Sequence, residues 1–318
     1  MIQISNEQLT ETLGFDQLVP ALREAFRGDY TVPLRHHHDF ENPKEGKDST
    51  LLLMPAWEAG RYLGVKVVTV APNNAKYQLP SIHGMYILMD AHKGVPLAWM
   101  DARTLTTRRT AAASALASSF LSREDSRSLL MIGTGALAPK LIEAHATVRP
   151  IEEIYIWGRN KTKAAAVAKY ITENLSFSSS RVHVVESLEE NLAKADIISC
   201  ATLSETPLVL GQHLRNGQHL DMVGAYKPNM READDEAIWR TRVFVDNYEG
   251  ATKETGDIAI PLQTGVLQRT AIQADLFELC REEKHGRQSS DEITFFKSVG
   301  HALEDLAAAK MAYEHIAR

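Results

Sequence analysis

One stretch, residues 127–159, constrains the fold of this chain more than any other. An apolar run over 129–132 leads into Gly133-Thr134-Gly135-Ala136-Leu137-Ala138, a helix-like segment follows, and a second apolar run begins at Ile154. Strand, glycine turn, helix and second strand in this order predict a βαβ unit whose turn and helix N-terminus bind the pyrophosphate of a dinucleotide. The residues predicted to bind this cofactor at the turn are Gly133, Gly135, Ala136, Leu137 and Ala138.

Small residues are needed at three of these positions. Gly133 permits the tight turn out of the strand, Gly135 lets the backbone approach the pyrophosphate, and Ala138 lets the new helix pack closely on the strand. The residues at the end of the second strand indicate whether the cofactor carries a ribose 2′-hydroxyl or a 2′-phosphate. A dinucleotide enzyme specific for NAD places an acidic residue there for the ribose 2′-hydroxyl, whereas this chain has Gly158-Arg159-Asn160-Lys161.

Two cations and an amide at 159–161 suit a 2′-phosphate, because guanidinium makes charge-assisted, bidentate bonds to phosphate. The sequence therefore predicts NADPH as cofactor, with NADH accepted less well, and Arg159, Asn160 and Lys161 as its binding residues. The alternative interpretation is a solvated turn that happens to be basic.

Length and composition narrow the class of partner. The 318 residues suit two domains, and 44% hydrophobic with 24% charged residues is typical of a globular protein. A formal charge of −6, without a basic stripe, favours a small-molecule partner over nucleic acid or an anionic membrane. The N-terminus has no signal-like segment and no apolar run approaches membrane-spanning length, so we expect a cytoplasmic protein.

The first third of the chain predicts a separate, β-rich domain. A short strand over 1–4 precedes an amphipathic helix that runs to Phe26, with Asn6 or Thr10 as its cap. Gly, Pro and Asn turns then separate segments that we expect to pair as antiparallel strands. These segments are 51–54, 62–70, 86–90 and 96–100.

Two cations in this region are candidates for ligand binding. Lys66 lies in the apolar run LGVKVVTVA, and Arg35 follows Val32-Pro33-Leu34. A cation in apolar surroundings requires an anionic or carbonyl partner, although either residue could simply point outward from its strand. The run His36-His37-His38-Asp39 is not expected to bind a metal, because successive residues of an extended chain point to opposite faces.

The segment 101–122, DARTLTTRRTAAASALASSFLS, predicts a helix with Thr104 or Thr106 as its cap. Arg108 and Arg109 would then fall in the first turn, where cations oppose the helix dipole unless they share an anionic ligand with the free N–H groups. This pattern predicts a carboxylate site next to the cofactor. An interdomain salt bridge is the alternative.

Strands and helices alternate after residue 159, which predicts an α/β fold with a doubly wound parallel sheet. The expected strands are 182–185, 196–201, 220–223 and 243–245, and the expected helices are 161–173, 188–194 and a short one near 211. Thr202 and Gly224 follow two of these strands, at the carboxyl edge where such sheets bind ligands. The tail from Phe295 is expected to form one long helix.

Eight motifs together resemble the ornithine cyclodeaminase/μ-crystallin family over nearly the full chain. They are Val32 to Arg35 (VPLR), Met54 to Ala56 (MPA), Leu63 to Lys66 (LGVK), Leu79 to His83 (LPSIH), Leu105 to Ala112 (LTTRRTAA), Gly133 to Ala138, Val223 to Ala225 (VGA) and Lys297 to Ala309 (KSVGHALEDLAAA). The resemblance implies a Rossmann-type domain over 113–294. It also implies a substrate-binding and dimerisation domain over 1–112 with 295–318, and a homodimer.

The resemblance also implies roles for individual residues. Arg35, Lys66 and Arg109 would hold a substrate carboxylate, and Lys66, Arg109 and His83 would be catalytic. A second group, with Arg109, would contact the nicotinamide end of the cofactor. This group is Ser81, His83, Thr110, Val223 and Ser298. Thr202 is expected to bind the cofactor because it lies at the carboxyl edge of the sheet.

One departure from the family pattern narrows the expected reaction. Cyclodeaminases carry Asp directly after the glycine-rich strand end, whereas this chain has Tyr226 in Gly224-Ala225-Tyr226-Lys227-Pro228. Tyrosine, with an ordinary pKa of ~10, is a poor base at neutral pH and cannot pair with an ornithine ammonium. The chain therefore looks closest to the bacterial Δ1-pyrroline-2-carboxylate reductases, which reduce cyclic ketimines.

The expected function is NADPH-dependent reduction of Δ1-pyrroline-2-carboxylate, and of Δ1-piperideine-2-carboxylate as a second substrate, to L-proline and L-pipecolate. The sequence leaves Lys66, His83 and water open as proton donors. Three alternatives remain: an alanine-dehydrogenase-like or N-alkyl amino acid reductase, an ornithine cyclodeaminase, and a non-catalytic μ-crystallin-like binding protein.

Overall fold

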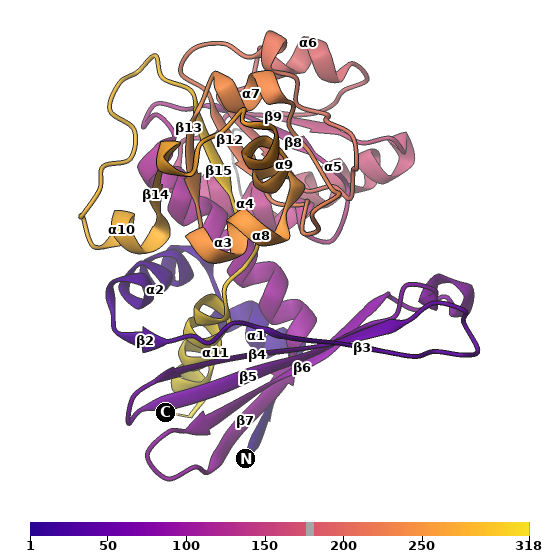
Figure 1. Ribbon diagram of the computed structural model, residues 1–318, viewed down its shortest axis with the longest axis vertical. Coiled ribbons are helices and arrows are strands. Elements are labelled where there is room, and N and C mark those ends of the chain that lie inside the picture. The colour runs from indigo at the N-terminus through magenta and orange to yellow at the C-terminus, as the bar shows by residue number, and fades with distance from the viewer. Residues whose placement is uncertain (176–180, 318) are drawn as a thin grey trace. The chain divides into compact units, whose positions relative to one another are not determined.

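The structure is a computed structural model that describes residues 1–175 and 181–317. It divides into two compact units, each with its own sheet (Figure 1). Unit 1 is Met1–Thr110 with His301–Arg318, and unit 2 is Ala111–Gly300. The family resemblance implied limits after residue 112 and before residue 295.

Unit 1 contains a seven-stranded sheet in the order β1-β7-β6-β5-β4-β2, with β3 paired to β4. The strand β1 runs parallel to β7 and the other pairs are antiparallel, as the sequence predicted for the strands from β4 to β7. The strands are β1 (Ile2–Ile4), β2 (Tyr30–Thr31), β3 (His36–Phe40), β4 (Ser49–Glu58), β5 (Tyr62–Val70), β6 (Ile82–Asp90) and β7 (Pro96–Asp101). The helices are α1 (Asn6–Thr12), α2 (Phe15–Arg27), η1 (Asn74–Tyr77), the first part of α3 (Ala102–Leu121), and α11 (Ala302–Ile316).

Burial alternates along the strands of this sheet because α11 covers one of its faces. In Figure 1, α11 lies across β4, β5 and β6, and α2 packs on α11. Lys66 is on the covered face, between the cross-strand neighbours Met54 and Tyr86, all three of which are buried. The lysine is therefore an inward residue of its strand, which removes the alternative of an outward one.

The N-terminal helical region differs from the expectation. It forms two helices rather than one, and Ser5 caps α1 by a capping box with Gln8, in place of Asn6 or Thr10. Gly14 separates the two helices and precedes Phe15, the first residue of α2. Two consecutive short helices can turn their apolar faces toward α11 independently, which a single straight helix cannot do.

Unit 2 contains the doubly wound sheet that the sequence predicted, with all strand pairs parallel. Its order is β10-β9-β8-β11-β12-β15-β13-β14, so the chain reverses direction across the sheet between β8 and β11. The strands are β8 (Ser128–Ile132), β9 (Glu153–Trp157), β10 (Arg181–Val184), β11 (Ile197–Cys200), β12 (His219–Met222), β13 (Arg242–Val245), β14 (Ile272–Asp275) and β15 (Thr294–Lys297). The helices are α4 (Ala138–Val148), α5 (Lys161–Asn174), α6 (Leu188–Leu192), η2 (Gly211–His213), α7 (Asp235–Trp239), α8 (Tyr248–Glu254), α9 (Gly256–Thr264), η3 (Arg269–Ala271) and α10 (Leu276–Cys280).

Two predicted helix boundaries are wrong. The tail does not form one helix from Phe295, because Thr294–Lys297 is β15, inserted between β12 and β13, and α11 begins only at Ala302. The helix α3 begins at Ala102, capped by Asp101, whose side chain accepts from the Thr104 N–H at 2.8 Å. Arg108 and Arg109 therefore lie in the second turn, where the dipole argument of the first turn no longer applies.

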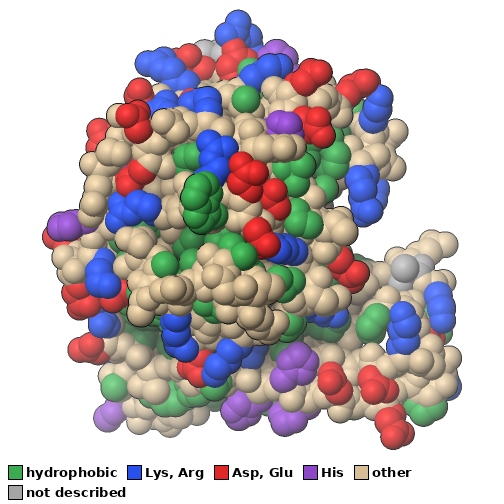
Figure 2. Space-filling model, turned by 45° about the horizontal axis from the view of Figure 1, so that its top comes forward, with side chains coloured by type: hydrophobic (Ala, Val, Ile, Leu, Met, Phe, Trp, Pro, Cys, Tyr) green, Lys and Arg blue, Asp and Glu red, His purple; other side chains and the backbone are tan. Residues whose placement is uncertain are grey.

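The surface carries charges of both signs. On the face drawn in Figure 2, Lys and Arg side chains are interspersed with Asp and Glu side chains. Among the residues that the structure describes, no helix is both long and apolar enough to cross a membrane.

Candidate functional site

The glycine-rich turn of unit 2 has the geometry that a bound pyrophosphate requires. Gly133 has a φ of +116°, and a Cβ there would meet the carbonyl oxygen of Ala201 at 2.5 Å, so the loops after β8 and β11 touch at this residue. A Cβ on Gly135 would meet nothing within 4 Å, which leaves its backbone open to a ligand. The helix α4 starts at Ala138 without a side-chain cap. Because the chain reverses between β8 and β11, this turn lies at the switch point where doubly wound sheets bind ligands.

The three residues predicted for a 2′-phosphate have different surroundings. Asn160 caps α5 by accepting from the Lys163 N–H at 3.0 Å, and Lys161 pairs with Glu186 at 2.6 Å. Arg159 is exposed and has no ion pair within residues 1–175 and 181–317. A Cβ on Gly158 would lie 2.5 Å from Thr134, so glycine at this position lets the end of β9 pack against the glycine-rich turn.

The other predicted cofactor residues of unit 2 follow three neighbouring strands. Thr202 follows β11, Val223 follows β12 and Ser298 follows β15. The buried hydroxyl of Ser298 has no hydrogen-bond partner in the described chain, whereas the hydroxyl of Thr202 donates to Glu232 at 2.9 Å. The topology therefore brings all three to the same carboxyl edge as the glycine turn.

In unit 1, Lys66 and Arg109 meet two carboxylates from the beginning of α11. The Lys66 Nζ lies 2.7 Å from Asp305 Oδ2, and Arg109 Nε lies 3.0 Å from Asp305 Oδ1. Arg109 Nη1 lies 2.6 Å from Glu304 Oε2. Lys66 is 3% and Arg109 5% exposed, and both carboxylates are fully buried. We call these four residues the cation cluster.

The cation cluster has hydrogen-bond donors that its own carboxylates do not use. The Nη2 group of Arg109 makes no hydrogen bond to the described residues. Among the described residues, the polar partners of Lys66 Nζ are Asp305 and, at 3.4 Å, the hydroxyl of Thr106, so one of its three N–H bonds is not used. The salt bridge of Arg109 lies within unit 1, which differs from the interdomain bridge considered as an alternative. Arg108, by contrast, donates to the Leu13 carbonyl at 2.9 Å and stacks over Phe15.

Electrostatics in the cation cluster are dominated by burial and by the paired charges. Burial lowers the pKa of Lys66 to about 8, while Asp305 opposes this shift and Arg109 and Arg35 reinforce it. Burial tends to raise the pKa of Asp305, but Arg109 and Lys66 outweigh it and hold that pKa below its ordinary value. Burial, with Arg35, lowers the pKa of His301 to about 4. Arg35, half-buried, therefore lies near enough to add positive potential to the cluster.

The structure does not bring every predicted residue of unit 1 to this cluster. Ser81 and His83 are exposed at the start of β6, and His83 is opposite Thr69 on β5. Because side chains alternate along a strand, His83 belongs to the face opposite that of Lys66 and Tyr86. Thr110, directly after Arg109, is 8% exposed.

Two sets of buried charges were missed from the sequence. Glu304 and Asp305 lie in LEDLAAA, where two acids among apolar residues are a signal of a buried ion pair. In unit 2, Lys297 Nζ lies 3.1 Å from Asp257 and 3.9 Å from Glu232, all three fully buried. The lysine follows Phe295-Phe296, an apolar run that should have indicated a strand.

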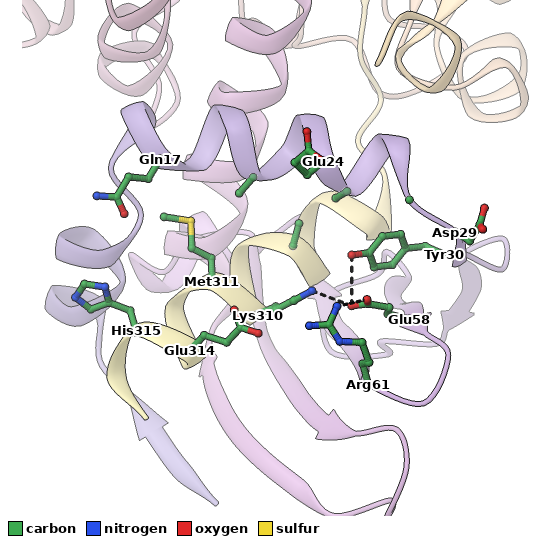
Figure 3. A pocket seen from close by; sticks show the side chains of 14 residues that line it. Gln17, Glu24, Asp29, Tyr30, Glu58, Arg61, Lys310, Met311, Glu314 and His315 are labelled. Carbon is green, nitrogen blue, oxygen red and sulfur yellow. Dashed lines mark hydrogen bonds and ion pairs between the residues drawn. The ribbon is translucent and has the colours of Figure 1, made fainter. Parts of the chain in front are cut away.

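Unit 1 also has a cavity of about 530 Å³ between α2, α11 and the β4–β5 turn (Figure 3). None of the predicted site residues lines it. Its central carboxylate, Glu58, contacts Lys310 at 2.8 Å, Arg61 at 2.5 Å and the Tyr30 hydroxyl at 3.4 Å. Because Glu58 already has these partners and the predicted site residues lie elsewhere, the cavity is not the candidate site.

The parallel sheet, its glycine turn and the open carboxyl edge define a protein with a Rossmann-type dinucleotide-binding unit. A family model described as ornithine cyclodeaminase/mu-crystallin matches residues 2–318. The chain belongs to this family, as its motifs suggested.

Relatives within the family have known names. A Δ1-pyrroline-2-carboxylate reductase of Colwellia psychrerythraea is 37% identical over 99% of both chains. The structure of a Thermococcus litoralis Δ1-pyrroline-2-carboxylate reductase with NADH and L-proline superposes with a TM-score of 0.91 at 35% identity, covering 99% of this chain and 97% of that one. An archaeal alanine dehydrogenase dimer with bound NAD superposes with a TM-score of 0.90 at 30% identity, covering 99% and 95%.

Proposed function

We propose that this protein is an NAD(P)H-dependent imine reductase that converts Δ1-pyrroline-2-carboxylate to L-proline. The observation that carries the proposal is the cation cluster, in which Lys66 and Arg109 are buried, charged and left with unused donors. Near full-length similarity to reductases of that name supports the choice of substrate. Δ1-Piperideine-2-carboxylate, one methylene larger, is proposed as a second substrate that gives L-pipecolate.

The carboxylate of the substrate would bind to Arg109 Nη2 and Lys66 Nζ, with Arg35 adding positive potential. A buried guanidinium and ammonium form strong charge-assisted bonds because little water competes for them. When bound, NAD(P)H supplies the hydride that the imine carbon accepts. Reduction also requires one proton on the imine nitrogen, and Lys66, with a pKa of about 8, holds a proton that it can release near neutral pH.

We propose NADPH as the preferred cofactor, with NADH accepted less well. Arg159 supports this choice, since it is exposed, follows β9 and has no ion pair among the described residues. Asn160 and Lys161 contribute less, because one caps α5 and the other already pairs with Glu186. The glycine turn fits either dinucleotide.

We further propose a homodimer that forms through the face of the unit 1 sheet opposite α11. Its side chains are apolar and only partly buried in the single chain, and they form continuous cross-strand rows. These residues are Leu53, Pro55, Trp57, Leu63, Val65, Val67, Met85, Ile87, Met89 and Trp99. A face of this kind is typical of an interface, and sedimentation equilibrium measures whether two chains associate.

The decisive experiment is an assay of the purified protein with NADPH and Δ1-pyrroline-2-carboxylate at neutral pH. We expect NADPH oxidation and one L-proline per NADPH, measured by absorbance and chiral chromatography. Pyruvate with ammonia or methylamine tests the second candidate, an alanine-dehydrogenase-like or N-alkyl amino acid reductase, which the alanine dehydrogenase neighbour favours. NADPH oxidation only with pyruvate and an amine would replace the first proposal by the second. No oxidation with any of these substrates would contradict both reductase proposals and leave the cyclodeaminase and the binding protein as alternatives.

A further inference from the structure

A buried carboxylate in unit 2 joins two loops at the carboxyl edge of the sheet. Glu232 Oε1 accepts from the Thr202 N–H at 2.7 Å and from the Thr202 hydroxyl at 2.9 Å. Its Oε2 accepts from the N–H groups of Gly224 at 2.7 Å and Ala225 at 3.2 Å. One side chain therefore holds the loop after β11 and the loop after β12.

The two loops that Glu232 joins are in direct contact. A Cβ on Gly224 would lie 2.0 Å from the carbonyl oxygen and 2.1 Å from the nitrogen of Thr202, so only glycine allows this approach. The backbone of Glu232 is itself anchored, because its N–H donates to Asp257 at 2.7 Å and its carbonyl accepts from the N–H groups of Leu208 and Val209.

The charge of Glu232 is partly compensated from the next strand, because burial and Asp257 raise the pKa of Glu232 and Lys297 opposes this shift. Lys297, the last residue of β15, contacts both Asp257 and Glu232, and Ser298 with its unpartnered hydroxyl follows directly. The ends of β11, β12 and β15 thus share one buried network of Glu232, Asp257 and Lys297, which we call the edge network. The segment from Gly224 to Glu232 is held at both ends, because the Gly224 N–H donates to the Glu232 side chain. This segment contains Tyr226, which is 42% exposed.

We propose that Glu232 is a positioning residue for the nicotinamide half of the cofactor, a proposal that rests on the function proposed above. The carboxylate occupies the N–H groups of Thr202, Gly224 and Ala225, so these loops cannot bind the ligand through them. Instead it holds the loops in the shape that the nicotinamide ring and its ribose require. It also holds the segment with Tyr226, the position that separates this chain from the cyclodeaminases.

A general stabilising role would not depend on where a buried carboxylate lies in the sheet. Asp221 offers the comparison, because it is equally buried in unit 2, within β12 rather than at its end, and accepts from Ser199 at 2.7 Å and contacts His145 at 3.0 Å. Asp221→Asn and Glu232→Gln each replace a buried carboxylate by an isosteric amide. Only the second alters the carboxyl edge.

The test measures binding of NADPH and of 2′,5′-ADP, which is the adenosine half alone, to the full chain by calorimetry. We expect Glu232→Gln to weaken the binding of NADPH by about tenfold or more, which corresponds to the loss of a charged hydrogen bond. The binding of 2′,5′-ADP should weaken by less than about twofold. Asp221→Asn should lower the melting temperature and leave both affinities unchanged. Thr202→Val, which removes one bond of the four, should weaken NADPH in the same direction by less and remains informative if Glu232→Gln fails to fold.

Unchanged NADPH affinity in Glu232→Gln would overturn the proposal. Equal weakening of NADPH and 2′,5′-ADP would also overturn it, because the residue would then only stabilise the unit. Binding is measured without turnover, so a wild-type protein that binds NADPH but does not reduce the imine contradicts the proposed reaction and not the role of Glu232.

Discussion

The cation cluster of unit 1 and Glu232, the central carboxylate of the edge network in unit 2, differ in how completely their hydrogen-bonding atoms are used. In the cation cluster, Lys66 and Arg109 keep donors that no described residue uses. In the edge network, Glu232 accepts four hydrogen bonds from the backbone and Thr202, whereas Lys297 Nζ and Asp257 Oδ2 are paired by charge but have no hydrogen-bond partner among the described residues. The unused donors of Lys66 and Arg109 suit a ligand, whereas the saturated acceptors of Glu232 suit a scaffold, because buried polar groups without partners are costly.

The strongest test of this comparison removes the charge of Asp305, the carboxylate that Lys66 and Arg109 of the cation cluster share. Asp305→Asn leaves buried Lys66 without a carboxylate partner and Arg109 with Glu304 alone, and we expect the free energy of unfolding to fall by about 3–5 kcal/mol. Urea unfolding measures this loss. Glu249→Gln, at an exposed pair with Lys253, is the control and should change nothing measurable. A loss below about 1 kcal/mol for Asp305→Asn would mean that the cations do not depend on it.

A second variant changes a predicted cofactor-binding residue that belongs to neither the cation cluster nor the edge network. Arg159→Ala should weaken the binding free energy of NADPH by roughly 1.5–3 kcal/mol, the contribution of a charge-assisted phosphate contact. The binding free energy of NADH should stay nearly unchanged. Dissociation constants for the two cofactors measure the difference. Lys161→Ala is the matched control, since Lys161 already pairs with Glu186, and should have a smaller effect. Equal losses of NADPH and NADH in Arg159→Ala would show that this residue does not distinguish the phosphate.

The pH dependence tests the charge of the cation cluster. Lys66, with a pKa of about 8, is charged below that pH, so kcat/KM for the imine should fall as the pH rises through about 8. Stability should change in the opposite direction. An unfolded lysine keeps its proton up to a pH of ~10.4, so the unfolded chain binds more protons between these values and stability rises with pH in that window.

A matched variant assigns this profile to Lys66. Asp305 raises the pKa of the lysine, so in folded Asp305→Asn the fall in kcat/KM should begin at a lower pH. An unmoved midpoint would assign the titration to another group.

The smallest expected effect concerns Tyr226, on the segment that the edge network closes. The wild-type protein should release neither ammonia nor proline from ornithine with catalytic NAD, because cyclodeamination needs a carboxylate to hold the ammonium and take its proton. Tyr226→Asp alone should restore little activity, since a preference for NADPH would still oppose a tightly held NAD. Neither Asp234, which caps α7, nor Asp235 replaces that carboxylate, since both lie beyond the segment. Stoichiometric ammonia and proline from the wild type would contradict the proposed function.

Much of unit 2 could be predicted from the sequence because the relevant signals are local. A glycine turn between an apolar run and a helix needs only neighbouring residues, and the alternation of strands and helices that follows implies a parallel sheet. The same holds for Lys66, since a lysine inside an apolar strand indicates a buried partner wherever that partner lies. The sequence could not name the partner.

Only the tertiary structure determined which residues are the charge partners in the cation cluster and in the edge network. Arg109 and Asp305 are 196 positions apart, and Lys66 reaches Asp305 only because α11 lies across β5. The strand β15 was mistaken for the start of a helix because its place between β12 and β13 depends on the sheet, not on its four residues. A buried charge is stabilised by groups that the fold brings to it, and chain order does not specify their distance. Periodicity therefore located the unusual charges, and the packing of distant elements determined what they bind.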